Sequence, residues 1–264
     1  MNFIDQIRRT VTIESPPRRI ISLVPSQTEL LAYFGLHEEV VGITKFCIHP
    51  DEWFRTKTRV GGTKNVNFNK IEQLKPDLII CNKEENNESD VKALMEKYPV
   101  WTSDIHNLDD AFNMITSLGE IIGKNDAAEN LVFKIKRNFD ELRHSQKAPQ
   151  GALYLIWKNP YMAAGKDTFI DYMMEQCGFI NVCYASHGRY PELTLEQIKA
   201  LQPQVILLSS EPYPFKEKHI TEFNIYFPGI LAVLADGEYF SWYGSRLLAA
   251  PTYLESLIKN CIKV

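Results

Sequence analysis

Five segments of the sequence combine aromatic and charged side chains in a pattern that suits ligand binding. Each follows or ends an apolar run, and they comprise residues 44–50, 82–86, 158–162, 209–216 and 240–246. In doubly wound α/β sheets, ligands bind beyond the carboxyl ends of the strands. Aromatic surface with a few fixed polar groups is what a small-molecule site requires. The alternative is that these aromatic residues only cover the ends of a core, but five such segments favour a binding site.

Most of the candidate ligand-binding residues lie in or beside these segments, and Thr63 is included because of the family resemblance described below. They are Phe46, His49, Thr63, Lys64, Asn82, Lys83, Trp157, Tyr161, Arg189, Tyr190, Glu211, Tyr213, Trp242 and Arg246. The cations among them suit an anionic ligand, although Glu84, Glu85 and Glu211 could pair with them and leave a neutral network. The Trp242 ring could stack on a planar ligand, and the Arg246 guanidinium could bind a carboxylate of that ligand. We expect Tyr190 and Lys83 to face these two residues. The alternative places Trp242 in a core and Arg246 in solvent.

Metal and enzyme signals are weak. Cys47 and His49 supply at most two ligands, whereas a closed zinc site needs four, so we predict no metal site and leave open whether this pair touches a metal. Residues 164–168 resemble the end of a phosphate loop, but Pro160 stands where its first glycine is required. We therefore predict no catalytic residues, no cofactor and no enzymatic activity.

The elements that must position these residues repeat within the chain. The segment IEQLKPDLIIC begins at Ile71, and IKALQPQVILL begins at Ile198, 127 positions later. Each predicts a short helix, a turn containing proline and a strand buried on both faces. Upstream of each copy lie an apolar strand pattern, a helical pattern and a glycine suited to a left-handed helix end, Gly35 or Gly178. The repeat therefore predicts two Rossmann-like α/β lobes that arose by duplication.

One long helix is predicted to connect the lobes. Residues 126–145 carry apolar side chains at helical spacing, with Asp126 as N-cap and Gly123 ending the preceding helix. Twenty residues would span about 30 Å. The predicted parts are an N-terminal lobe over 1–122, a rigid backbone helix over 123–148 and a C-terminal lobe over 149–264.

Composition narrows the class of protein. The chain has 264 residues, of which 45% are hydrophobic and 23% charged, with a formal net charge of −4. These values predict a folded protein, expected to be a monomer, with a small-molecule ligand and no nucleic-acid partner. The first twenty residues lack the apolar core of a secretion signal, which predicts a cytoplasmic protein as written, or a periplasmic one if the sequence is a processed form. Five scattered cysteines predict buried thiols and no disulfide framework.

Motifs in a fixed order give the chain a family resemblance. They are residues 17–31, VGIT at 41–44, Gly61-Gly62, LKPDLII at 74–80 and LEQI at 195–198. The chain resembles the class III, helical-backbone substrate-binding proteins of ABC transporters, which include vitamin B12-binding and ferric-siderophore-binding proteins. The resemblance implies two α/β lobes joined by one long helix. It also implies a cobalt- or iron-containing chelate (a corrinoid or a ferric siderophore) held in the cleft between the lobes, and an ABC permease as partner.

The chain departs from the vitamin B12-binding pattern at several positions. Thr63, Asn82 and Tyr190 stand where that pattern has tryptophans. Asn69 replaces the first glutamate that docks on the permease, whereas Glu196 matches the second. A cytosolic enzyme or ligand sensor on the same scaffold, uncoupled from a transporter, is therefore the alternative function.

Overall fold

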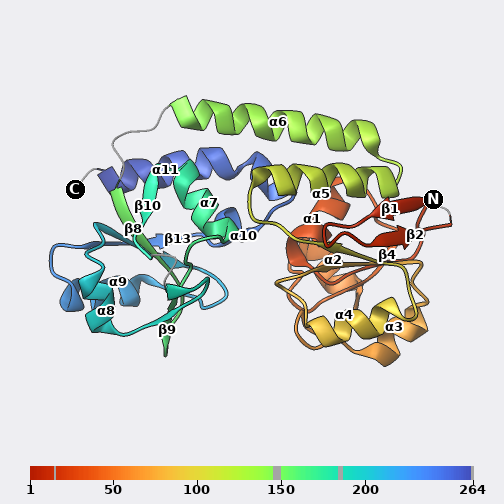
Figure 1. The fold of residues 1–264 in the computed structure, drawn as a ribbon, viewed down its shortest axis with the longest axis horizontal. Helices are drawn as coiled ribbons and strands as arrows, with labels where there is room; N and C mark the ends of the chain where they lie inside the picture. The colour runs from red at the N-terminus through yellow and green to blue at the C-terminus, as the bar shows by residue number, and fades with distance from the viewer. Residues whose placement is uncertain (15, 145–149, 184–186, 263–264) are drawn as a thin grey trace. The chain divides into compact units, whose positions relative to one another are not determined.

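Two compact units make up the chain. The computed structural model describes residues 1–14, 16–144, 150–183 and 187–262 (Figure 1). The first unit comprises Met1–Lys134 and Tyr243–Arg246, and the second comprises Ile135–Trp242 and Leu247–Val264. The chain thus leaves the second unit near its end, adds a short segment to the first, and returns.

A parallel sheet of five strands forms the centre of the first unit. Its strand order is β5-β4-β3-β6-β7, and the strands are β3 (Ile20–Ser22), β4 (Val40–Ile43), β5 (Thr58–Arg59), β6 (Leu78–Asn82) and β7 (Val100–Ser103). All residues of β3, β6 and β7 are buried, as expected for strands covered on both faces. An antiparallel hairpin of β1 (Asn2–Ile4) and β2 (Thr10–Thr12) precedes the sheet.

Helices cover both faces of this sheet. They are α1 (Pro25–Tyr33), α2 (Asp51–Thr56), α3 (Phe68–Leu74), α4 (Glu88–Met95) and α5 (Leu108–Ile121). Figure 1 shows α3 and α4 on the face opposite α5. Ile71 of α3 and Leu94 of α4 are buried in one cluster with Ile21, Ile79 and Val100 of the strands.

The second unit has a mixed sheet. Its strand order is β11-β9-β8-β12-β13, and β10 also pairs with β8. The strands are β8 (Gln150–Trp157), β9 (Tyr161–Ala163), β10 (Phe179–Asn181), β11 (Glu192–Leu193), β12 (Val205–Ser209) and β13 (Leu231–Ala235). β8, β10, β12 and β13 pair in parallel, whereas β9 pairs antiparallel with both β8 and β11.

The helices of the second unit also lie on two faces. They are α7 (Phe169–Gln176), α8 (Leu195–Ala200), α9 (Glu217–Tyr226), α10 (Glu238–Ser241), the 3-10 turn η2 (Ser245–Leu248) and α11 (Ala250–Ile262). Figure 1 shows α8 and α9 on one side of the sheet and α7 with α11 on the other. Ile198 of α8 and Phe223 of α9 are buried with Leu153 and Ile206.

The predicted repeat is confirmed in both units. The pair α3–β6 in the first corresponds to α8–β12 in the second. Lys75 and Gln202, which are 127 positions apart and each precede a proline, both adopt left-handed backbone, with φ of 46° and 48°. Gly35 after α1 and Gly178 after α7 both have φ of 77°, as the pattern predicts.

The long helix α6 (Asn125–His144) joins the two units and has 20 residues. The boundary between the units falls inside it, after Lys134. Gly123 has φ of 69° after α5, as predicted. Asp126 is not the N-cap, because the helix already begins at Asn125. The predicted helix end at residue 148 lies outside the described residues, and the three predicted domain ranges stay predictions.

Burial of the cysteines agrees with the sequence. All five thiols, those of Cys47, Cys81, Cys177, Cys183 and Cys261, are free and buried. Across the described ranges, no helix has the length and apolar character required to span a bilayer.

Candidate ligand-binding site

A hollow of about 580 Å³ lies in the first unit at the segments that follow β4 and β5. Its lining is Lys45, Phe46, Gly61, Gly62, Thr63, Lys64, Asn65, Val66 and Asn67. Three predicted ligand residues, Phe46, Thr63 and Lys64, are therefore brought together here. Phe46 is 50% exposed, so an apolar surface is available in a hollow that is also lined by lysine, threonine and asparagine side chains.

A tight turn shapes this hollow. Gly61 has φ of 115°, and a Cβ atom there would approach the Asn65 carbonyl oxygen to 2.5 Å. Only glycine fits such a position without strain. The Gly62 amide donates to the Asn65 carbonyl at 2.8 Å, and the Lys45 amide donates to the Gly61 carbonyl at 2.8 Å. The turn is thereby fixed to the segment that carries Phe46.

Asn86 connects the turn to the sheet. Its buried side-chain amide donates to the Thr63 carbonyl at 3.0 Å and to the Leu23 carbonyl at 3.1 Å, and its Oδ1 accepts from the Asn82 amide at 2.7 Å. Lys64 Nζ donates to the Glu84 carbonyl at 2.5 Å. These bonds hold the wall of the hollow before any ligand arrives.

Asn82 shapes its own loop. The side chain is buried, its Oδ1 accepts from the amides of Glu84 and Glu85 at 2.8 and 2.9 Å, and its Nδ2 donates to Ser103 Oγ at 3.0 Å. This arrangement orders the residues that follow β6. Direct contact of Asn82 with a ligand stays a prediction.

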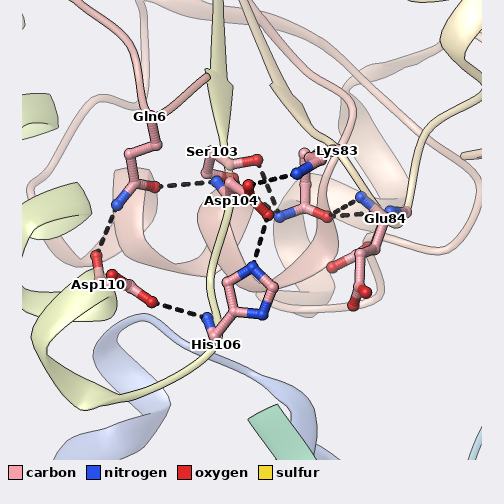
Figure 2. A network of polar contacts seen from close by, with 9 residues as sticks. Gln6, Lys83, Glu84, Ser103, Asp104, His106 and Asp110 are labelled. Carbon is pink, nitrogen blue, oxygen red and sulfur yellow. Dashed lines mark hydrogen bonds and ion pairs between the residues drawn. The ribbon is translucent and has the colours of Figure 1, made fainter. Parts of the chain in front are cut away.

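Lys83 belongs to a polar network of the first unit (Figure 2). Its ammonium pairs with Asp104 Oδ2 at 2.6 Å, and His106 Nε2 donates to the other carboxylate oxygen at 3.1 Å. Gln6 accepts from the Asp104 amide at 3.1 Å and donates to the Asp110 carbonyl at 2.8 Å. The cationic Lys83 thus already has a carboxylate partner.

Cys47 is surrounded by hydroxyl groups. Its Sγ lies 3.1 Å from Thr28 Oγ1 and 3.2 Å from Thr44 Oγ1. Burial raises the pKa of the Cys47 thiol, which disfavours the thiolate that a metal requires. Within the described ranges, no three His, Cys, Asp or Glu side chains are arranged to hold a metal ion. A role for partly exposed His49 in ligand binding stays a prediction.

An aromatic group lies beyond β8 and β12 in the second unit. The Trp157 and Tyr213 rings pack edge to face with centroids 5.8 Å apart, and Trp157 is 39% exposed. Tyr213 Oη lies 3.3 Å from His219 Nε2, and burial lowers the pKa of His219. This group presents aromatic surface beside a buried imidazole.

Lys158, Tyr161 and Glu222 form an ion-paired cluster at the same place. Lys158 Nζ pairs with Glu222 Oε2, and Tyr161 Oη donates to Glu222 Oε1 at 3.1 Å. Burial alone would raise the pKa of Glu222. The hydrogen bond and the positive charge of Lys158 outweigh burial, so the pKa of Glu222 is lowered from its ordinary value. The sequence analysis missed Glu222, because nothing in the spacing of α9 links it to Lys158, 64 positions earlier. It also passed over Lys45, although this residue lies in segment 44–50.

Trp242 and Arg246 have partners inside their own units. Trp242 is buried, and its Nε1 donates to Glu211 Oε1 at 2.9 Å, which also accepts from Ser241 Oγ at 2.7 Å. Arg246 belongs to the first unit, where its Nη2 pairs with Glu29 Oε1 at 2.6 Å. The structure thus gives both residues structural contacts, and their contact with a ligand stays a prediction.

The remaining predicted residues are Arg189, Tyr190 and Glu196 of the second unit and Asn69 of the first. The Arg189 carbonyl accepts from the Gly165 amide at 2.7 Å, and Tyr190 is 38% exposed. Glu196 is exposed in the first turn of α8, and Asn69 holds the equivalent exposed position in α3. The structure leaves all four roles predicted from the sequence open.

The duplicated α/β architecture, its connecting helix and the preformed hollow define a two-unit binding protein. Residues 20–224 match the family model described as periplasmic binding protein, and the chain belongs to this family. The resemblance to class III substrate-binding proteins of ABC transporters is confirmed.

Relatives with curated descriptions include the vitamin B12-binding protein of Vibrio cholerae serotype O1. It is 26% identical over 197 residues, which cover 74% of this chain and 71% of that protein. An uncharacterized ABC transporter substrate-binding lipoprotein of Bacillus subtilis is 28% identical over 213 residues, covering 77% and 67%.

Solved structures share the fold. The periplasmic vitamin B12 binding protein of Vibrio cholerae superposes with a TM-score of 0.81 at 22% identity, covering 94% of this chain and 99% of that one. A periplasmic heme-binding protein from Roseiflexus has a TM-score of 0.79 at 22% identity, covering 92% and 98%. At these identities the comparison shows the fold alone.

Proposed function

We propose that the chain is the solute-binding protein of an ABC transporter and that it binds a metal chelate, either a corrinoid or an iron complex. The observation that carries the proposal is the hollow beside Phe46, preformed by Gly61 and Asn86, in a chain of the periplasmic binding protein family. An exposed aromatic ring next to fixed polar groups suits a large ligand that is partly apolar. Family membership favours this function over the cytosolic enzyme or sensor.

A thermal-shift screen tests the ligand class. Cobalamin, cobinamide, heme and ferric siderophores are each added to the purified protein. A ligand present at 100 times its Kd should stabilise the fold by about 2.7 kcal/mol, a rise in Tm of roughly 5–10 °C for a chain of this size. Phe46→Ala should reduce that rise and leave the Tm of the unliganded protein nearly unchanged, because the ring is half exposed. Absence of a shift with every compound would rule out this ligand class.

We propose that binding occurs without chemical conversion and outside the cytoplasm. The relatives bear names that describe binding proteins, periplasmic or lipid-anchored. Fractionation of the native cells tests the location, and recovery of the protein from the cytosol would contradict it. Mass spectrometry of a bound ligand after release tests the chemistry, since the ligand should leave unaltered.

We propose an ABC permease as the partner, contacted through Glu196. The support is its exposed place in the first turn of α8 and its match to the family's docking glutamate. Glu196→Gln should reduce ligand-stimulated ATPase activity of the reconstituted transporter. Glu192→Gln, at an exposed position on β11, is the matched control. Equal activity of the two variants would contradict the proposed contact.

A further inference from the structure

The hollow of the first unit carries positive charge and no negative charge in its lining. Lys45 and Lys64 are its charged members, and the remaining lining residues are Phe, Gly, Thr, Asn and Val. Both lysines are exposed. A concave surface with two cations attracts an anion more strongly than either cation would alone.

Neither lysine is neutralised by the described part of the chain. The Lys64 ammonium donates to the backbone carbonyls of Glu84 and Asn86, at 2.5 and 3.5 Å. The Lys45 ammonium lies 5.0 Å from the centroid of the Phe46 ring. Carbonyl dipoles and a ring face orient an ammonium without cancelling its charge.

Other lysines of the chain are paired with carboxylates. In the second unit, Lys158 is paired with the carboxylate of Glu222, and Lys166 is paired with Asp171 at 3.1 Å. In the first unit, Lys83 is paired with Asp104, and Glu85 accepts from Tyr243 Oη at 2.6 Å. Lys45 and Lys64 therefore differ from Lys83, Lys158 and Lys166, whose charges have carboxylate partners.

We infer that the hollow binds an oxyanion, with Lys45 and Lys64 as its two cationic contacts and Phe46 as the apolar surface beside it. This inference deepens the proposed function and rests on it. The oxyanion is either a carboxylate substituent of an organic chelate or a free inorganic oxyanion, since both offer oxygens to an ammonium. A ligand whose periphery ends in amides would leave both charges unused.

Binding of five defined probes tests the inference. Heme and its dimethyl ester share one macrocycle but differ in the two carboxylates. Molybdate and inorganic phosphate represent free oxyanions, and dicyanocobinamide represents a chelate with amide side chains. We expect at least one oxyanion-bearing probe to bind. Selective binding of heme over its ester identifies a carboxylate, whereas binding of molybdate or phosphate identifies a free oxyanion.

Charge substitutions locate the site. Lys45→Gln and Lys64→Gln should each lower the affinity for the oxyanion by about tenfold, and Lys64→Arg should retain most of the affinity. Lys92→Gln removes an exposed charge from α4 in the same unit and is the matched control. The Tm of each unliganded variant confirms that the fold is retained.

Two results would overturn the inference, and they are distinguishable. If dicyanocobinamide alone binds, or if the lysine variants bind every probe as tightly as the unaltered protein, the oxyanion site is wrong while the proposed function stands. If neither these probes nor the compounds of the thermal-shift screen bind, the proposed function fails together with the inference.

Discussion

Arg246 holds Glu29 through two hydrogen bonds, from Nη2 to Oε1 at 2.6 Å and from Nε to Oε2 at 3.3 Å. The two residues are 217 positions apart, and both side chains are mostly shielded from solvent, with exposed fractions of 16% and 22%. A paired guanidinium and carboxylate at a shielded position are stabilising mainly because removal of one leaves the other uncompensated.

Arg246→Ala is therefore expected to lower the free energy of unfolding by about 1–3 kcal/mol. Urea denaturation measures this change in the free energy of unfolding. Glu29→Gln and the double variant complete a cycle, and their coupling should exceed 0.5 kcal/mol. Strict additivity would show that the pair contributes nothing beyond its separate side chains.

Asn86→Ala should destabilise the first unit and distort the hollow. The substitution leaves the Thr63 and Leu23 carbonyls and the Asn82 amide without their partner. We expect a loss of roughly 2–4 kcal/mol and a weaker response to ligand. Asn65→Ala removes an exposed side chain from the same hollow and should change stability by less than about 0.5 kcal/mol. Equal stability of the two variants would contradict the connecting role of Asn86.

Glu211→Gln should make the stability of the second unit less dependent on pH. Burial raises the pKa of Glu211 above its ordinary value of 4.5, although the hydrogen bonds from Ser241 and Trp242 partly offset burial. The folded protein then binds more protons than the unfolded chain, so stability falls as pH rises from about 4.5 through the raised pKa.

Glutamine keeps an oxygen acceptor for Ser241 and Trp242 but cannot ionise. The stability of the variant relative to the unaltered protein should therefore increase as pH rises from 4.5 to neutrality. Urea denaturation at a series of pH values measures this difference. Glu217→Gln, at an exposed position of α9, should show no such trend, and a constant difference for Glu211→Gln would contradict the prediction.

Lys75→Gly and Gln202→Gly should each stabilise the protein. Both residues are exposed and have positive φ, a conformation that costs a residue with a Cβ atom about 1 kcal/mol relative to glycine. Greater freedom of glycine in the unfolded chain reduces the gain, so we expect up to about 1 kcal/mol at each site.

Gly35→Ala provides the reverse substitution. Gly35 has φ of 77°, and a Cβ atom there would meet nothing within 4 Å, so the expected loss of about 1 kcal/mol is conformational. Differential scanning calorimetry of the three variants compares these effects. A lower Tm for both glycine substitutions would show that the backbone is not strained there.

The repeat made the architecture predictable, but it did not make the partners of long-range contacts predictable. Segments at Ile71 and Ile198 share periodicity, a proline and an apolar strand, so local patterns sufficed for both units. Residues 240–246 look equally local, with aromatic residues and an arginine near a strand. Their contacts depend instead on residues far away in the chain: Trp242 bonds to Glu211, Tyr243 to Glu85 and Arg246 to Glu29.

The candidate site was predictable only in part, for the same reason. Phe46 was predicted because it lies in a segment that follows a strand, Lys64 because it is a cation beside the predicted cleft loops, and Thr63 only through the family resemblance. The sequence also marked Asn82 and Lys83, but gave no sign that Ser103 and Asp104 engage their side chains.

The segment Tyr243–Arg246 makes the first unit discontinuous in the chain. A gene fragment ending at Lys134 would encode the sheet and helices of that unit. It would lack Tyr243, which donates a hydrogen bond to Glu85, and Arg246, which pairs with Glu29. Exchange of one lobe between relatives must therefore transfer two separate stretches of coding sequence, because a swap with a single crossover in α6 would combine the first unit of one relative with segment 243–246 of the other.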